Sequence, residues 1–169
     1  QFRHSFESIR SMNPDARIVY LMRDPLDRYE SNIAHHIARD EGVSIDKWRD
    51  SKKAKNALDY GRYYLQIGPF LSLFGPERVF LGVFEDFVSD QAAFIRRICD
   101  FIGIDPDGVR IPSEQRNPRR NANHAGYFQL SKKDEQFIAH TLKTDINCLE
   151  VSTDRDFTSW WPRYRRELE

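Results

Sequence analysis

Short apolar runs alternate with longer amphipathic segments along this chain. Residues 18–22 form a compact apolar run of strand length, IVYLM, and residues 78–84, RVFLGVF, form a second one. Uninterrupted apolar runs of this length are typical of parallel strands that are buried on both faces. The pattern therefore predicts two strands of a parallel sheet.

Two helices are predicted in the segment between these strands. Pro25 is well placed in a first helical turn, where its missing N–H costs nothing, and this helix is expected to extend to about Arg39. Residues 54–74 are the longest segment with apolar positions at helical spacing. They predict one long helix, with a kink or a break at Gly68-Pro69.

Capping residues mark two further helices. Asp90 is the predicted N-cap of a helix over residues 90–102, and Gly103 follows its C-terminus. Ser131 is the predicted N-cap of a last helix over residues 131–150, with an acidic residue three positions later, as in a capping box. Both helices therefore have a start signal that is independent of their apolar pattern.

The order of these elements sets the fold class. Strands separated by helices indicate an α/β fold, with a parallel sheet flanked by helices. One domain is expected over residues 1–169, although a two-stranded sheet is a poor core and indicates that further strands are missing. The expected elements are a helix at 4–12, a strand, turn and helix at 17–39, the long helix at 54–74, a strand at 78–84, a helix at 90–102, an irregular basic loop at 105–126 and a helix at 131–150.

Composition and charge narrow the classes of partner. Hydrophobic residues make up 40% of the chain and aromatic ones 13%, which is typical of a globular protein. The 26 basic and 26 acidic side chains balance, so no overall field attracts nucleic acid or an anionic membrane. The longest apolar runs are far shorter than the ~20 residues that span a bilayer. Any anion binding must therefore come from local clusters.

The chain has two cysteines, Cys99 and Cys148, each on a predicted helix near apolar neighbours. We interpret them as buried free thiols, with a single disulfide as the alternative. Reduced thiols favour a cytoplasmic location. No set of cysteines and histidines has the spacing of zinc ligands, so no metal is expected.

The turn after the first strand carries the strongest candidates for chemistry. Arg23 follows that strand, and a guanidinium at the carboxyl end of a parallel strand points into the crevice where α/β proteins bind ligands. It can hold a phosphate with two parallel hydrogen bonds, or it can form an ion pair with Asp24 or Asp27. Ser31 lies on the second turn of the next helix and is either a second phosphate ligand or an ordinary surface residue.

The motif around these residues resembles a known one. Arg23-Asp24-Pro25-x-x-Arg28-x-x-Ser31, after an apolar strand, is similar to the 3′-phosphate-binding motif of the sulfotransferases that use 3′-phosphoadenosine 5′-phosphosulfate. That family also has a helix with Tyr-Gly, a strand followed by acidic residues, and a helix that ends in Phe-Leu-Gly. This chain has Tyr60-Gly61-Arg62-Tyr63, then RVFLGVFEDF, then ICDFIG. The resemblance implies a P-loop-like α/β sulfotransferase fold.

The resemblance also implies roles for single residues. Arg23 and Ser31 match the residues that contact the 3′-phosphate of the donor. Tyr60 matches a residue that packs on the adenine, although it can equally be a core tyrosine. Arg119 and Arg120, in the long basic loop, match a segment that closes over the 3′-phosphate, or else they belong to a solvated charged loop.

Part of the family's donor site has no counterpart in these residues. In the family a glycine-rich loop with a lysine holds the 5′-phosphosulfate, and residues 1–169 contain no such loop. The chain therefore resembles the C-terminal two thirds of a sulfotransferase, with the N-terminal strand and the phosphosulfate loop missing. An N-terminal segment is expected in the full protein, and the catalytic residues are unknown, since the catalytic base usually comes from that segment.

The resemblance implies a sulfotransferase that moves a sulfuryl group from 3′-phosphoadenosine 5′-phosphosulfate to a hydroxyl or amine of a small-molecule or glycan acceptor. Adenosine 3′,5′-bisphosphate is the implied product, and this chain would supply the 3′-phosphate half of the donor site. Two alternatives stay open. One is a fragment of a P-loop nucleotide kinase, for which neither a Walker loop nor a Mg²⁺-binding acid is visible. The other is an inactive α/β nucleotide-binding or interaction domain.

Overall fold

The structure is a computed structural model that describes residues 5–39, 51–110 and 130–160. Its internal contacts divide the chain into two compact units, and each is described by itself. Unit 1 is Gln1–Arg23 with Tyr63–Gln115, and unit 2 is Asp24–Arg62 with Arg116–Glu169. The single domain over residues 1–169 stays a prediction.

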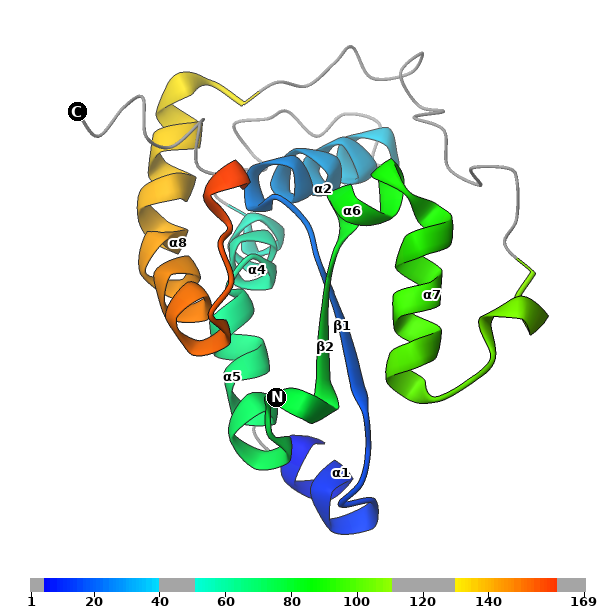
Figure 1. The fold of residues 1–169 in the computed structure, drawn as a ribbon. Coiled ribbons are helices and arrows are strands. Elements are labelled where there is room, and N and C mark those ends of the chain that lie inside the picture. Colours follow the sequence, from blue (N-terminus) through cyan, green and yellow to red (C-terminus); the bar gives the residue numbers. More distant parts are fainter. Residues whose placement is uncertain (1–4, 40–50, 111–129, 161–169) are drawn as a thin grey trace. The chain divides into compact units, whose positions relative to one another are not determined.

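Unit 1 holds the sheet. Strands β1 (Ile18–Met22) and β2 (Val79–Val83) pair in parallel, and Figure 1 shows them side by side. The mixed α/β class with a parallel sheet is thus confirmed in the residues that the structure describes. The helices of this unit are α1 (Ser5–Met12), α5 (Tyr63–Phe74), α6 (Phe84–Ser89) and α7 (Gln91–Ile102).

The second strand is shorter than the apolar run that predicts it. Arg78 belongs to a short 3₁₀ helix, Pro76–Arg78, and Phe84 is already the first residue of α6. The helix α6 was not predicted, and it takes up the segment between β2 and the N-cap of α7. Phe84, the last residue of the apolar run, contacts Phe87 on the same helix, with ring centroids 6.1 Å apart.

The two strands differ in burial. Strand β2 is buried at Val79, Leu81 and Val83, whereas Val19 and Leu21 of β1 are 41% and 53% exposed. Side chains alternate between the two faces of a strand, and the described residues cover the face of β1 that carries Met22. The prediction that both strands are buried on both faces is therefore wrong for β1.

An aromatic cluster joins β2 to α7. The ring of Phe80 lies 5.9 Å from that of Phe94 and 5.5 Å from that of Phe101, between centroids. Gly82 has no side chain beside this cluster. A Cβ there would lie 2.6 Å from the Phe94 ring and 2.7 Å from Leu21, so glycine allows the close packing.

The predicted caps of the helix after β2 are present. The Asp90 carboxylate accepts a hydrogen bond from the Ala93 N–H at 2.9 Å. At the other end Gly103 has φ 80, and its N–H donates to the Cys99 carbonyl. Glycine takes this left-handed conformation without the strain that a side chain would add.

Replacing Asp90 with alanine is expected to lower the free energy of unfolding by about 1 kcal/mol, because the helix loses its side-chain cap. Urea denaturation followed by circular dichroism measures the change. Asp100→Ala is the matched control, since Asp100 is an exposed residue within the same helix. An Asp90→Ala protein as stable as the control would contradict the assignment of this cap.

In the part of unit 2 that the structure describes, the main elements are helices. They are α2 (Pro25–Arg39), α4 (Lys52–Tyr60) and α8 (Lys132–Thr153), and α2 packs against both of the others. Side chains at helical spacing along α8 fill the centre of the unit. The most buried of its residues, each with at most 2% exposure, are Pro25, Leu26, Ile33, Ala54, Ile138, Leu142, Ile146, Leu149, Phe157 and Trp160.

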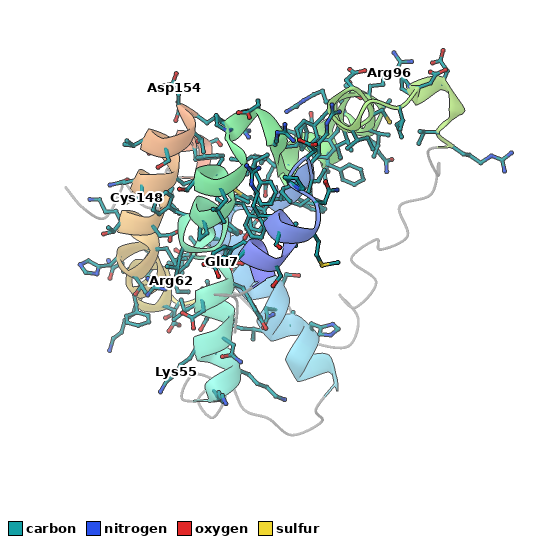
Figure 2. The ribbon with its side chains drawn as sticks, turned by 90° about the horizontal axis from the view of Figure 1, so that it is seen from below. Glu7, Lys55, Arg62, Arg96, Cys148 and Asp154 are labelled. Atoms are coloured by element: carbon teal, nitrogen blue, oxygen red, sulfur yellow. The ribbon has the colours of Figure 1, made fainter. Side chains whose placement is uncertain are left out.

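The last helix has a complete capping box. The Ser131 hydroxyl accepts from the Asp134 N–H at 3.2 Å, and the Asp134 carboxylate accepts from the Ser131 N–H at 3.3 Å. The helix ends at Thr153, and the C-cap Asp154, which is labelled in Figure 2, has φ 49. It is thus a little longer than the 131–150 that the sequence predicts.

The long helix predicted over residues 54–74 is wrong, because two helices occupy this segment. The chain leaves α4 at Gly61 and Arg62, whose N–H groups donate to carbonyls three residues earlier, and such bonds tighten and end a last turn. A Cβ on Gly61 would also lie 2.9 Å from Leu142 of α8. Pro69, where the break was expected, lies inside α5.

Candidate functional site

Arg23 lies directly after β1, and two contacts within unit 1 hold it there. The Tyr63 hydroxyl donates to the Arg23 carbonyl at 2.6 Å and accepts from the Arg23 N–H at 3.3 Å. The guanidinium carbon lies 5.2 Å from the centroid of the Phe84 ring, which is within the range of a cation–π interaction. Both the main chain and the side chain of Arg23 are therefore fixed by named partners.

The strand register explains why Phe84 contacts Arg23. Met22 pairs with Val83, and the next residues along the two strands are Arg23 and Phe84. Because the strands are parallel, both residues follow the carboxyl ends of their strands at the same edge of the sheet. Open α/β sheets bind ligands at this edge.

The turn after Arg23 starts helix α2 in unit 2. The Asp24 carboxylate accepts from the N–H of Leu26 at 2.8 Å and of Asp27 at 3.4 Å, so Asp24 caps the helix. Pro25 is the first helical residue, where no N–H is needed. The Arg-Asp-Pro sequence thus combines a strand end, a cap and a helix start in three residues.

Ser31 lies on the second turn of α2, and its side chain is exposed. The neighbouring Ile33 is 2% exposed and faces the core of unit 2. The helix therefore buries one side and presents Ser31 on another. A hydroxyl at an exposed position can donate a hydrogen bond to a phosphate oxygen.

Tyr60 is the last residue of α4 and is 44% exposed, so it is not a fully buried core tyrosine. The guanidinium carbon of Arg28, on α2, lies 5.8 Å from the centroid of its ring. Both residues belong to unit 2, and both lie in the segments that resemble family motifs. This contact ties the end of α4 to the first turns of α2.

The predicted ligands fall into different parts of the chain. Arg23 belongs to unit 1, and Ser31 and Tyr60 belong to unit 2, so their convergence on one ligand stays a prediction. Arg119 and Arg120, with most of the basic loop, lie outside the described residues. A guanidinium and a hydroxyl are nevertheless the kinds of donor that phosphate oxygens accept from.

Sequence reasoning missed two residues of this region, Tyr63 and Phe84. Tyr63 lies in the Tyr-Gly segment, but no local sequence pattern indicates that its hydroxyl bonds to the main chain of Arg23, forty residues upstream. Phe84 was assigned to the strand. The strand register would have indicated Phe84, because the residues that directly follow two paired parallel strands lie next to each other.

The residues that the structure describes hold no candidate metal site, membrane-spanning helix or disulfide. Among residues 5–39, 51–110 and 130–160 no group of three histidine, cysteine or acidic side chains is placed to bind a metal ion. In the same ranges no helix is both long and apolar enough to cross a bilayer. Cys99 and Cys148 are free thiols, so the disulfide alternative is not realised. Cys99 is buried as predicted, whereas Cys148 is only half-buried.

Comparison with known proteins gives the family. The model of the sulfotransferase family matches residues 3–108. The fold is similar to that of a sulfotransferase from Alicyclobacillus acidocaldarius, with a TM-score of 0.73 at 23% identity. The match covers 92% of this chain and 62% of that one. A search of curated proteins found no match. Because the family model spans more than half of the sequence, the chain belongs to the sulfotransferase family.

Proposed function

We propose that this chain binds the 3′-phosphate of 3′-phosphoadenosine 5′-phosphosulfate within a sulfotransferase that acts on a hydroxyl or amine of a small-molecule or glycan acceptor. The observation that carries the proposal is the position of Arg23 at the carboxyl edge of the sheet. Membership of the sulfotransferase family supports the reaction class. The free thiols favour a reducing compartment such as the cytoplasm.

Arg23 is suited to a phosphate by its charge and its fixed geometry. A guanidinium presents parallel N–H groups that match two oxygens of one phosphate. The Tyr63 hydroxyl fixes its main chain, and the Phe84 ring lies against its side chain. Less side-chain freedom then remains to be lost when the ligand binds, which strengthens binding.

Unit 2 contributes the groups proposed for the rest of the nucleotide. Ser31 would donate its hydroxyl to the same phosphate, and Tyr60 would pack against the adenine. The Arg28 guanidinium supports the Tyr60 ring from the side of α2. The donor itself supplies the sulfuryl group, so the task proposed for these residues is to bind and orient the nucleotide.

Titration with adenosine 3′,5′-bisphosphate tests the proposal. Isothermal titration calorimetry with this nucleotide should show saturable binding, and adenosine 5′-monophosphate should bind much more weakly, since it lacks the 3′-phosphate. Equal affinity for the two nucleotides would contradict a 3′-phosphate site. No binding of either would favour an α/β domain without a nucleotide ligand.

Replacing Ser31 with alanine is expected to weaken binding of adenosine 3′,5′-bisphosphate about tenfold, because one hydrogen bond to a charged acceptor is lost. The stability should stay unchanged, since the side chain is exposed. Ser152→Ala is the matched control, an exposed serine on another helix of unit 2. Equal affinities of the two variants would remove Ser31 from the proposed site.

A further inference from the structure

Tyr63 is a completely buried residue with a polar hydroxyl. It is the first residue of α5, and its exposure is 0%. A buried hydroxyl is costly unless it is hydrogen-bonded. Here the hydroxyl uses both its donor and an acceptor position on one residue, the Arg23 main chain, at 2.6 Å and 3.3 Å.

These two bonds begin where the sheet stops. The register of β1 and β2 ends with Met22 beside Val83, so Arg23 is the first residue beyond the paired positions. The Tyr63 hydroxyl bonds to the N–H and the carbonyl of that residue. The hydroxyl of Tyr63 therefore restrains the main chain one residue beyond the paired strand, at Arg23, which carries the guanidinium.

The ring of Tyr63 is itself held in place. Tyr20 meets it edge to face, with centroids 6.2 Å apart and an angle of 77°. The Tyr20 hydroxyl in turn donates to the side-chain carbonyl of Gln66 on α5 at 3.0 Å. Two tyrosine hydroxyls thus connect β1 and its end to α5: that of Tyr20 bonds to Gln66, and that of Tyr63 bonds to the Arg23 main chain.

We propose that Tyr63 is a positioning residue, which fixes the Arg23 main chain so that the guanidinium is presented to the 3′-phosphate of the nucleotide. The inference rests on the proposed function for its ligand. Its first step, the restraint of the Arg23 main chain by the Tyr63 hydroxyl, concerns the protein alone and can be measured without a ligand.

The test compares Tyr63→Phe with Tyr20→Phe in the 169-residue chain. Each substitution keeps the ring and removes one hydroxyl that links the β1 segment to α5. Amide hydrogen exchange at Arg23, observed by NMR, is the first measurement. It should become about tenfold faster in Tyr63→Phe than in Tyr20→Phe, because only the former loses the acceptor of the Arg23 N–H.

The second measurement is nucleotide selectivity. The ratio of the Kd for adenosine 5′-monophosphate to that for adenosine 3′,5′-bisphosphate should fall about tenfold in Tyr63→Phe and stay unchanged in Tyr20→Phe. General damage to unit 1 would weaken both nucleotides and leave the ratio unchanged. An unchanged ratio in Tyr63→Phe, with wild-type selectivity present, would overturn the positioning role.

The two proposals can fail separately. If the wild-type chain shows no preference for the bisphosphate, the proposed function fails. If the Arg23 amide proton exchanges at the same rate in both variants, the restraint of the Arg23 main chain by Tyr63 is overturned. If Tyr63→Phe does not fold, the wild-type protein gives a replacement measurement. The Tyr63 hydroxyl proton should then exchange slowly and show a nuclear Overhauser effect to the Arg23 amide proton, and the lack of that effect would overturn the inference.

Discussion

Replacing Arg23 with alanine should weaken binding of adenosine 3′,5′-bisphosphate about a hundredfold. A hydrogen bond to a charged group contributes about 1.5–3 kcal/mol, and a bidentate contact to phosphate makes two of them. The loss of about 3 kcal/mol corresponds to roughly two orders of magnitude in Kd. The large effect follows from the loss of charge as well as of both donors.

Stability should change much less than affinity in this variant. The main-chain bonds to Tyr63 survive the substitution, and the contact with Phe84 that is lost contributes about 1 kcal/mol. Calorimetric titration and thermal unfolding of the same samples separate the two effects. Arg96→Ala is the matched control, an exposed arginine on α7 of the same unit that Figure 2 labels.

Arg23→Lys adds an intermediate case. An ammonium keeps the charge but lacks the planar pair of donors, so its affinity should lie between those of the wild type and Arg23→Ala. An Arg23→Ala protein that binds the bisphosphate as tightly as Arg96→Ala would show that Arg23 is not a ligand. The Arg-Asp-Pro motif would then resemble the family motif in the structure of the turn but not in phosphate binding.

Ile146→Ala should lower the free energy of unfolding by about 2–5 kcal/mol, which is the usual range when a buried aliphatic side chain is truncated. Ile146 is 0% exposed in the middle of α8, among Leu142 and Leu149 on the same face of the helix. Its removal leaves a cavity in the core of unit 2. The effect tests α8 as part of that core, beyond the residues 3–108 that the family model matches.

Urea denaturation followed by tryptophan fluorescence suits this measurement, because Trp160 is buried in unit 2 with 2% exposure. Val151→Ala is the matched control, since Val151 is an aliphatic residue of the same helix that is 86% exposed. The control should stay within about 0.5 kcal/mol of the wild type. Equal midpoints for Ile146→Ala and Val151→Ala would show that α8 contributes no core packing.

Local signals in the sequence were the most reliable guides to the fold. Asp90, Gly103 and Ser131 cap helices where they were predicted to, because a cap depends on groups only a few residues away. Pro25 starts α2 for the same local reason. The family likewise follows from short motifs, and the match to the family model confirms it.

Predictions that depended on distant contacts succeeded less well. The break between α4 and α5 lies at Gly61, which packs beside Leu142 of α8, and no signal near Gly68-Pro69 could show that. The outer face of β1 is exposed at Val19 and Leu21, although its composition is that of a strand buried on both faces. The composition of a strand shows that its side chains can be buried. Which of its faces is buried depends on the elements that pack against it.

The sequence by itself determined the order of strand, turn and helix around Arg23, the capped helices and the sulfotransferase family. Only the tertiary structure decided what holds Arg23. The strand register brings Phe84 beside its guanidinium, and Tyr63 on α5 bonds to its main chain. Caps and turns are specified by bonds between near neighbours in the chain. These contacts instead join residues that are 40 and 61 positions apart, which meet only when the sheet and α5 pack together.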